Sequence, residues 1–264
     1  MQRIAKLSLF ARWSGRCIRL PRAGRAASTG QLQGMMQDNP LVVSDLLDYA
    51  VRVHGDREIV SRTVEDPSAV HRCVCIIFMS RCGSSASTVS AIAIRGVTLP
   101  PPHAPRYTYS DAGTRTLKLA NALARLGVGV GDRVATIAWN GYRHFELYYA
   151  ISGSGAVLHT INPRLAPEQL GYVINHAEDK VICVDLTFAK PVVSLLSKLP
   201  SIKAVIVLTD KQHMPDFAEP NVLCYEDLLS AEDASFRWPS LDERQACSLC
   251  YTSGTTGVPK GVLY

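Results

Sequence analysis

The densest group of residues suited to chemistry lies at the end of the chain, over residues 251–264. There the sequence Tyr-Thr-Ser-Gly-Thr-Thr-Gly-Val-Pro-Lys-Gly-Val-Leu-Tyr combines four serine and threonine hydroxyls with three glycines and one lysine, Lys260. Glycine lets the backbone approach a polyanion and aim N–H groups at it, while hydroxyl groups donate hydrogen bonds and lysine adds positive charge. This composition predicts a phosphate-binding loop, and the apolar run 247–251 predicts the strand that delivers it. The structural alternative is a flexible turn.

The loop does not match two common nucleotide-binding motifs. A Walker A loop that began at Gly254 would need its second glycine at position 259, where this chain has proline. Two Gly-x-Gly segments, at 127–129 and 153–155, lack the third glycine of a dinucleotide fingerprint. We interpret both segments as helix ends and points of close packing.

Cysteine and histidine residues offer weaker candidate sites. Cys247 and Cys250 form a single Cys-x-x-Cys pair inside the predicted strand, which favours packing over redox or metal chemistry. The residues of an imaginable metal cluster, which has no usual zinc spacing, are His71, Cys73, Cys75 and Cys82. The seven histidines show no metal or nucleophile spacing, and we expect His144 and His176 to lie on helix surfaces. No secretory signal precedes the eight cysteines, so reduced thiols in an intracellular compartment are expected.

From residue 108 onward, predicted strands alternate with predicted helices, as an α/β fold requires. The predicted strands are 133–138, 156–161, 181–184, 204–208 and 247–251. The predicted helices are 110–126, capped by Ser110 and Asp111, then 142–152, a helix opened by Pro167 and Glu168, and one near 187–198. Strands separated by helices pair in parallel through right-handed crossovers. We therefore predict a mostly parallel sheet with flanking helices.

The upstream part of the chain contains one regular element and one irregular segment. Residues 41–54 predict a helix that ends at Gly55, while 58–60 and 106–109 predict two strands of a hairpin. The residues between these strands, about 67–105, lack acidic residues and leave through a proline-rich run. We interpret them as an inserted loop, for which a retained intron is one origin. The hairpin can tolerate such an insertion because loop-closure entropy grows slowly with loop length.

The first 37 residues resemble a targeting segment. They carry seven basic and no acidic residues, and apolar residues at 4, 7 and 10 can share a helical face. This composition is typical of a mitochondrial transit peptide. Plastid import is one alternative, and a mis-assigned start codon, which would leave the protein in the cytoplasm, is another.

Composition limits the function classes. The chain has 264 residues, of which 47% are hydrophobic and 19% charged, so it can bury a core. It has no apolar run long enough for a spanning helix. The net charge of +5 comes from two acid-free segments, 1–37 and 67–110, which together hold eleven basic residues. The rest of the chain has 17 basic and 23 acidic residues. We therefore expect no nucleic-acid partner.

The string Tyr-Thr-Ser-Gly-Thr-Thr-Gly-x-Pro-Lys-Gly resembles the signature phosphate loop of the adenylate-forming, or AMP-binding, superfamily. This superfamily includes acyl-CoA synthetases, firefly-type luciferases and peptide-synthetase adenylation domains. Further similar segments lie at 107–111, 119–123, 131–135 and 162–165. Residues 139–146 are most similar to medium- and long-chain fatty acyl-CoA ligases, a branch that includes methylthiopropionate-CoA ligases. The resemblance covers 38–66 and 106–264.

The resemblance implies two-step chemistry on a small carboxylic acid. The acid attacks ATP in the presence of Mg²⁺ to give an acyl-adenylate and pyrophosphate, and CoA then displaces AMP. The implied ATP phosphate-binding residues are Thr252, Ser253, Gly254, Thr255, Thr256, Gly257 and Lys260. Lys260 is also the implied catalytic residue, and Thr252 is the implied ligand of magnesium.

Family members continue well beyond the signature loop, into an acyl pocket, an adenine-binding segment, an acidic magnesium ligand and a C-terminal domain with a catalytic lysine. We expect residues 38–264 to be the incomplete N-terminal portion of the AMP-binding large domain, inactive alone. The alternative is a non-catalytic nucleotide-binding or regulatory fragment.

Overall fold

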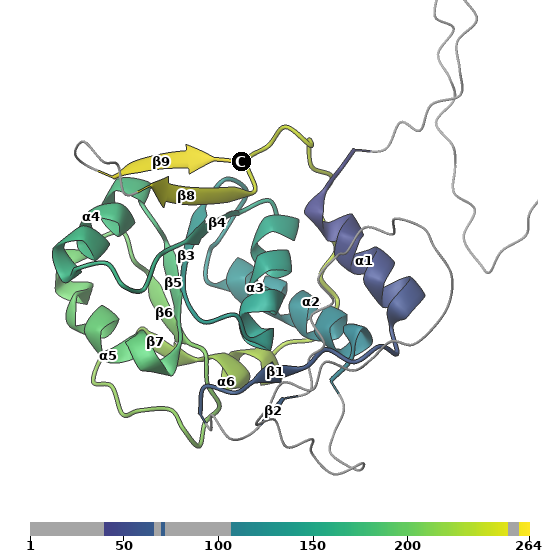
Figure 1. The fold of residues 1–264 in the computed structure, drawn as a ribbon, viewed down its shortest axis with the longest axis horizontal. Coiled ribbons are helices and arrows are strands. Elements are labelled where there is room, and N and C mark those ends of the chain that lie inside the picture. The colour runs from purple at the N-terminus through teal and green to yellow at the C-terminus, as the bar shows by residue number, and fades with distance from the viewer. Residues whose placement is uncertain (1–39, 66–69, 72–106, 253–258) are drawn as a thin grey trace, which may run out of the picture. The chain divides into compact units, whose positions relative to one another are not determined.

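The computed structural model describes residues 40–65, 70–71, 107–252 and 259–264, all within one compact unit, Pro40–Tyr264 (Figure 1). Seven strands form a sheet in the order β7-β6-β5-β3-β4-β8-β9. Their bounds are β3 Arg133–Ile137, β4 Val157–Thr160, β5 Val181–Val184, β6 Ala204–Val207, β7 Val222–Cys224, β8 Ser248–Thr252 and β9 Lys260–Leu263. The first six pair in parallel, and only β9 runs antiparallel, along β8. The predicted α/β class is confirmed.

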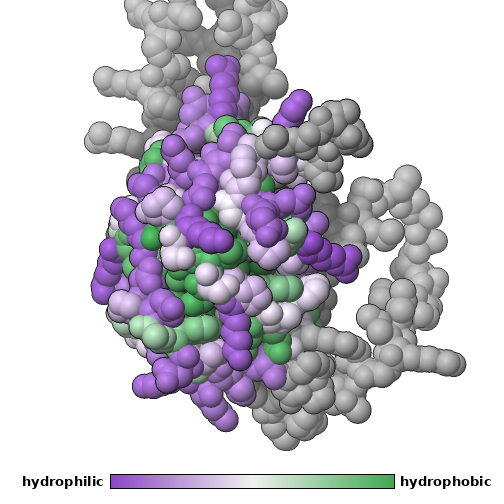
Figure 2. All heavy atoms as spheres, turned by 90° about the vertical axis from the view of Figure 1, so that its left-hand side faces the viewer, coloured by the Kyte–Doolittle hydropathy of each residue, from purple (hydrophilic) through white to green (hydrophobic). Residues whose placement is uncertain are grey.

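Helices cover both faces of this sheet (Figure 1). Their bounds are α1 Val43–His54, α2 Tyr109–Arg125, α3 Tyr142–Gly153, α4 Pro167–Ala177, α5 Leu186–Ser194 and α6 Tyr225–Ser230, with a 3-10 turn at Leu196–Lys198. One core cluster joins α2, α3 and α6 to one face, and another joins α4 and α5 to the opposite face. The outer surface on the α4 and α5 side carries polar side chains around a smaller apolar area (Figure 2).

Strand β5 shows why its continuous apolar run forms a central strand. Val181 and Cys183 belong to the α2–α3 core, whereas Ile182 and Val184 belong to the α4–α5 core, and all four are fully buried. A strand covered on both faces needs apolar residues at every position. Burial of each large aliphatic side chain contributes about 1.5–3 kcal/mol.

The start of α2 differs from its predicted start. Ser110 and Asp111 were expected to cap the helix, but the cap is Thr108 and the helix begins at Tyr109. The Thr108 hydroxyl accepts from the Asp111 N–H at 3.3 Å, and the Asp111 carboxylate accepts from the Thr108 N–H at 2.8 Å. This reciprocal capping box satisfies two helix-end donors, which fixes the start of the helix at Tyr109, two residues before Asp111.

The predicted hairpin upstream of α2 is present as a short antiparallel bridge. Glu58 pairs with Thr108, and the Ile59 N–H donates to the Tyr107 carbonyl at 2.9 Å. Two further short strands, β1 (Ser61–Arg62) and β2 (Val70–His71), also pair. The rest of the proposed insertion and the proposed transit peptide lie outside the described residues.

Both Gly-x-Gly segments end helices, as predicted. Gly127 and Gly155 follow α2 and α3 with φ of +79° and +85°, in the left-handed region that favours glycine. A Cβ on Gly155 would also approach Leu241 Cδ2 to 2.9 Å. Among the described residues, no helix is long and apolar enough to cross a membrane.

Candidate functional site

The signature loop is carried between two paired strands. Thr252, the last residue of β8, pairs with Lys260, the first residue of β9. Both side chains are exposed. The other predicted phosphate-binding residues, Ser253, Gly254, Thr255, Thr256 and Gly257, lie outside the described residues.

The structure corrects one expectation about the loop's end. Lys260 was expected within the phosphate-binding loop, but it belongs to β9, which pairs with β8 over four residue pairs from Leu249–Leu263 to Thr252–Lys260. The glycine and lysine near its start have weak strand preferences. Their strand conformation comes from pairing with β8, which brings the Lys260 side chain beside Thr252.

The sheet topology places the two described ends of the loop, Thr252 and Lys260, where open α/β sheets usually bind ligands. Strand β3 leads to α3 on one face of the sheet, while its neighbours β4 and β5 lead to α4 and α5 on the other. The connections therefore diverge at the carboxyl ends of the strands, and ligands favour this edge. Thr252 lies at the carboxyl end of β8, beside β4.

A cavity of about 160 Å³ lies next to Thr252 at this edge. Its lining residues are His159, Thr160, Ile161, Asn162, Leu165, Gln169, Val173, Tyr251, Thr252 and Pro259. They come from the end of β4, the first turns of α4 and both sides of the signature loop. Hydroxyl and amide groups here are suited to hydrogen-bonding phosphate oxygens.

Asp185 is a second polar group at the carboxyl edge, and the sequence reasoning missed it. It follows β5, and its Oδ2 accepts from the Trp139 N–H at 2.6 Å. Burial raises the pKa of Asp185 to about 6, although that hydrogen bond favours the charged form. The sequence signal that could have indicated Asp185 is an acidic residue directly after the apolar strand Val181–Val184. Asp185 ties the end of β5 to the connection between β3 and α3.

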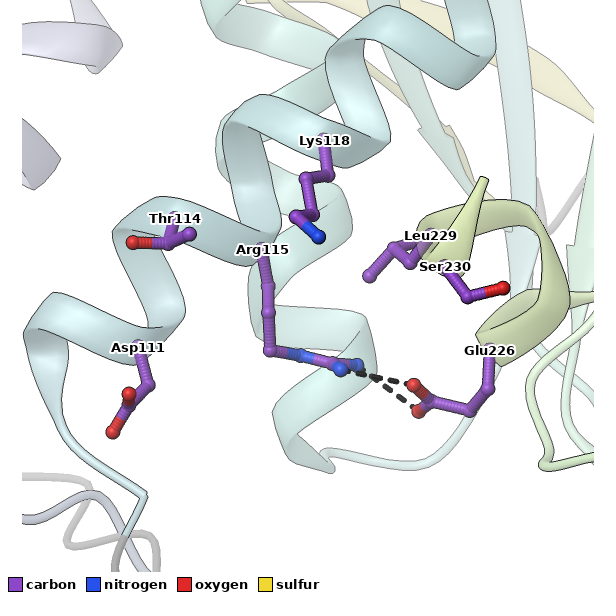
Figure 3. A pocket seen from close by; sticks show the side chains of 7 residues that line it. All are labelled: Asp111, Thr114, Arg115, Lys118, Glu226, Leu229 and Ser230. Atoms are coloured by element: carbon purple, nitrogen blue, oxygen red, sulfur yellow. Dashed lines mark hydrogen bonds and ion pairs between the residues drawn. The ribbon is translucent and has the colours of Figure 1, made fainter. Parts of the chain in front are cut away.

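A larger hollow, of about 290 Å³, lies between α2 and α6 (Figure 3). Arg115 spans it, donating to both Glu226 oxygens at 2.9 and 3.0 Å and to Glu146 at 2.7 Å. Glu226 also accepts from Arg143 at 2.9 Å. Burial opposes ionisation of Glu226, but the arginine hydrogen bonds outweigh it and lower its pKa. Because these charges satisfy one another, we assign the cluster to holding α2, α3 and α6 together.

The two histidines expected on helix surfaces have different environments. His176 is exposed on α4, as predicted, and its Nδ1 lies 2.6 Å from the Tyr251 hydroxyl. The prediction for His144 is wrong, because this residue is only 7% exposed and its Nε2 lies 3.2 Å from Thr136 Oγ1. Burial lowers the pKa of His144 to about 4, so the ring is neutral at pH 7.

The thiols show no sign of metal binding in the described part of the chain. Cys183, Cys224, Cys247 and Cys250 are free, and the described ranges contain no metal-binding group of three or more His, Cys, Asp or Glu. Cys250 Sγ lies 3.4 Å from Thr160 Oγ1. Cys247 was predicted inside the strand but precedes β8, and both cysteines are half-buried. His71 is the one member of the imagined metal cluster among the described residues.

The fold and the sequence motif together define an open, mostly parallel α/β protein whose glycine-rich segment follows strand β8 in the sequence. A family profile described as AMP-binding enzyme matches residues 86–264. The chain belongs to this family, as its signature predicted.

Curated relatives are fatty-acid and related CoA ligases. The chain is 42% identical to a medium-chain-fatty-acid–CoA ligase of Ectopseudomonas oleovorans, over 88% of this chain and 36% of the relative. It is 38% identical to a 3-methylmercaptopropionyl-CoA ligase of Ruegeria lacuscaerulensis over the same shares. A long-chain-fatty-acid–CoA ligase of Thermus thermophilus is 37% identical, over 87% of this chain and 34% of the relative. The chain thus spans about a third of the length of these relatives.

Solved structures share the fold at lower identity. A provisionally named long-chain-fatty-acid CoA ligase from Rhodopseudomonas palustris has a TM-score of 0.60 and 20% identity, over 85% of this chain and 44% of that one. An anthranilate CoA ligase solved with anthranoyl-AMP has a TM-score of 0.53 and 23% identity, over 61% of this chain and 29% of that one.

Proposed function

We propose that this chain supplies the phosphate-binding part of an ATP-dependent carboxylic acid–CoA ligase. The observation that carries the proposal is the pairing of Thr252 with Lys260, which joins the two ends of the glycine-rich segment at the carboxyl edge of the sheet. The curated relatives act on medium-chain and long-chain fatty acids and on 3-methylmercaptopropionate, by their names. We therefore propose an acid of this class as substrate.

The proposed roles of the two described residues are electrostatic. A carboxylate oxygen of the acid attacks the α-phosphorus of ATP, the bond to the β-phosphate oxygen breaks, and pyrophosphate leaves. Lys260 binds the β- and γ-phosphates and stabilises the charge that develops on the leaving group. The glycine backbone and hydroxyls between Thr252 and Lys260 add donors that hold the phosphates in line.

Magnesium fits this site through Thr252. The Thr252 hydroxyl is an exposed oxygen beside the cavity, and magnesium prefers oxygen ligands. When bound, the ion supplies positive charge that weakens the bond to the leaving pyrophosphate. CoA enters in the second step, in which its thiol attacks the acyl carbonyl and AMP leaves.

We further propose that the 264-residue chain alone forms no acyl-CoA. It spans about a third of its relatives' length, and positioning of both reactants is worth on the order of 7–11 kcal/mol. A non-catalytic nucleotide-binding fragment is the second candidate, since the same loop would serve it. Binding of Mg-ATP without AMP release is expected for both, and AMP release that follows the pure protein would overturn our proposal of inactivity.

The test of phosphate binding is the substitution Lys260→Ala. We expect affinity for Mg-pyrophosphate, measured by calorimetry, to fall about tenfold or more, because a hydrogen bond to a charged group contributes about 1.5–3 kcal/mol. Lys211→Ala is the matched control, since Lys211 is exposed and follows β6 away from the loop. Equal affinities in the two variants would contradict the proposed role of Lys260.

We also propose mitochondrial import through residues 1–37. The support is their seven basic and no acidic residues and the apolar spacing at their start.

A further inference from the structure

We propose that Tyr251 is a positioning residue that holds both ends of the signature loop in register. Its ring lies against β9, its hydroxyl is bound to His176 on α4, and its other neighbour is a buried His159–Asp179 pair. The proposal rests on the phosphate-binding function proposed for Thr252 and Lys260.

Tyr251 is placed next to both loop ends. It precedes Thr252 on β8 and pairs with Gly261, which follows Lys260 on β9. The Tyr251–Gly261 pair is therefore the first support beneath the Thr252–Lys260 pair. A shift of β8 against β9 at this point would move the Thr252 hydroxyl relative to the Lys260 ammonium.

Gly261 gives the Tyr251 ring its place against β9. A Cβ at position 261 would lie 3.1 Å from Tyr251 Cζ and 3.3 Å from Cε2, which is tighter than ordinary contact. The ring therefore occupies the space that a side chain on β9 would fill. Because the ring belongs to β8 and packs on the backbone of Gly261, it bridges the two strands.

The hydroxyl of Tyr251 fastens this ring to the body of the domain. It lies 2.6 Å from His176 Nδ1, and the two residues are 75 positions apart in sequence. The His176 ring is itself stacked on Tyr172, with ring centroids 5.4 Å apart. The hydrogen bond thus joins the base of the loop to α4, a helix packed on the sheet.

A buried, hydrogen-bonded pair of side chains, His159 and Asp179, lies next to the ring. The His159 ring centroid lies 5.1 Å from that of Tyr251, and His159 Nδ1 lies 2.7 Å from Asp179 Oδ2. Both side chains of this pair are fully buried. His159 Nε2 and Asp179 Oδ1 have no hydrogen-bond partner in the described structure, and buried polar atoms without partners are costly. We ascribe the pair to holding the His159 ring against Tyr251.

A ligand-binding role for Tyr251 has less support than the positioning role. A ligand in the neighbouring 160 Å³ cavity would contact Thr252 and Tyr251, but that cavity belongs to the site already described. The positioning role uses every contact of Tyr251 named above and requires no added group.

The decisive variants remove the hydrogen bond between Tyr251 and His176 and keep the fold. Tyr251→Phe removes the hydroxyl and keeps the ring, and His176→Leu removes the partner. Each should weaken Mg-pyrophosphate binding to the full chain about two- to tenfold, the range of one hydrogen bond. The double variant should be no weaker than either single one, because both remove the same contact. His176→Gln should restore part of the affinity. Tyr49→Phe, at an exposed tyrosine on α1, should leave it unchanged.

A second readout separates failure of this proposal from failure of the proposed function. Amide hydrogen exchange at Thr252 and Lys260, without ligand, should speed up in Tyr251→Phe and in Gly261→Ala. The unfolding midpoint of Tyr251→Phe should match that of the control Tyr49→Phe. Unchanged exchange overturns the positioning role whether or not pyrophosphate binds. If exchange speeds up but Lys260→Ala binds normally, the positioning role stands and the phosphate-binding function fails.

Discussion

Replacing Glu146 by glutamine tests the buried charge cluster. The Glu146 side chain is fully buried, and it accepts from Arg115 Nε at 2.7 Å. It also accepts from the hydroxyls of Tyr107 and Tyr225. Glutamine has the same shape, but its amide offers one acceptor oxygen where the carboxylate offers two, and it removes the charge opposite Arg115. We expect a loss of about 3 kcal/mol, at the low end for a broken buried pair, because Arg115 keeps Glu226.

Urea unfolding followed by tryptophan fluorescence measures this loss as a lower midpoint at unchanged slope. The matched control is Glu178→Gln, because Glu178 makes an ion pair with Arg133 at 2.9 Å but its side chain is 77% exposed. Exposed pairs contribute about 0–1 kcal/mol. If both variants lost the same stability, or Glu146→Gln lost less than about 1 kcal/mol, the ionic cluster would not hold the helices together as we argue.

Other predictions follow from single features. Burial raises the pKa of Asp185 to about 6, so the protonated side chain stabilises the fold fully below its unfolded pKa of about 3.9, and this stabilisation is lost as pH rises through 6. Wild type should therefore lose about 2–3 kcal/mol of stability relative to Asp185→Asn between pH 4 and 7. A stability difference that does not change with pH would contradict this. Gly155→Ala should cost at least about 1 kcal/mol, since its φ is +85° and a Cβ would meet Leu241, whereas Gly171→Ala within α4 should gain up to about 1 kcal/mol; thermal melts compare the two. A fluorescent fusion of residues 1–37 should enter mitochondria, and a diffuse cytosolic signal would favour the mis-assigned start.

The central strands could be predicted because their physical signal is local. The range predicted for β5 matches the structure, and those for β3, β4 and β6 are within two residues, because strands buried on both faces are continuous apolar runs between turns. Helix α6 and strand β7 were missed, since elements of six and three residues carry too little periodicity. Strand β9 was missed because its structure depends on pairing with β8.

The site was predictable only as far as its motif. The signature string identified the family, but the support beneath it depends on contacts between distant residues, such as His176 with Tyr251. The error on His144 has a similar cause. Helix α3 buries nine of its twelve residues, so it has no wide polar face from which exposure could be judged.

The sheet order also has a consequence for synthesis on the ribosome. Strand β3 is the first strand of the sheet to emerge, yet it lies at the centre, with β4 and β5 on either side. Each later strand therefore adds to the edge of a sheet that is already present. Strand β8 is added to β4, from which it is separated by about 90 residues in the sequence. We expect most of the domain to be assembled before the signature loop is attached, because contacts between distant residues form late. A nascent chain stalled before residue 248 should accordingly resist proteolysis over β3–β6.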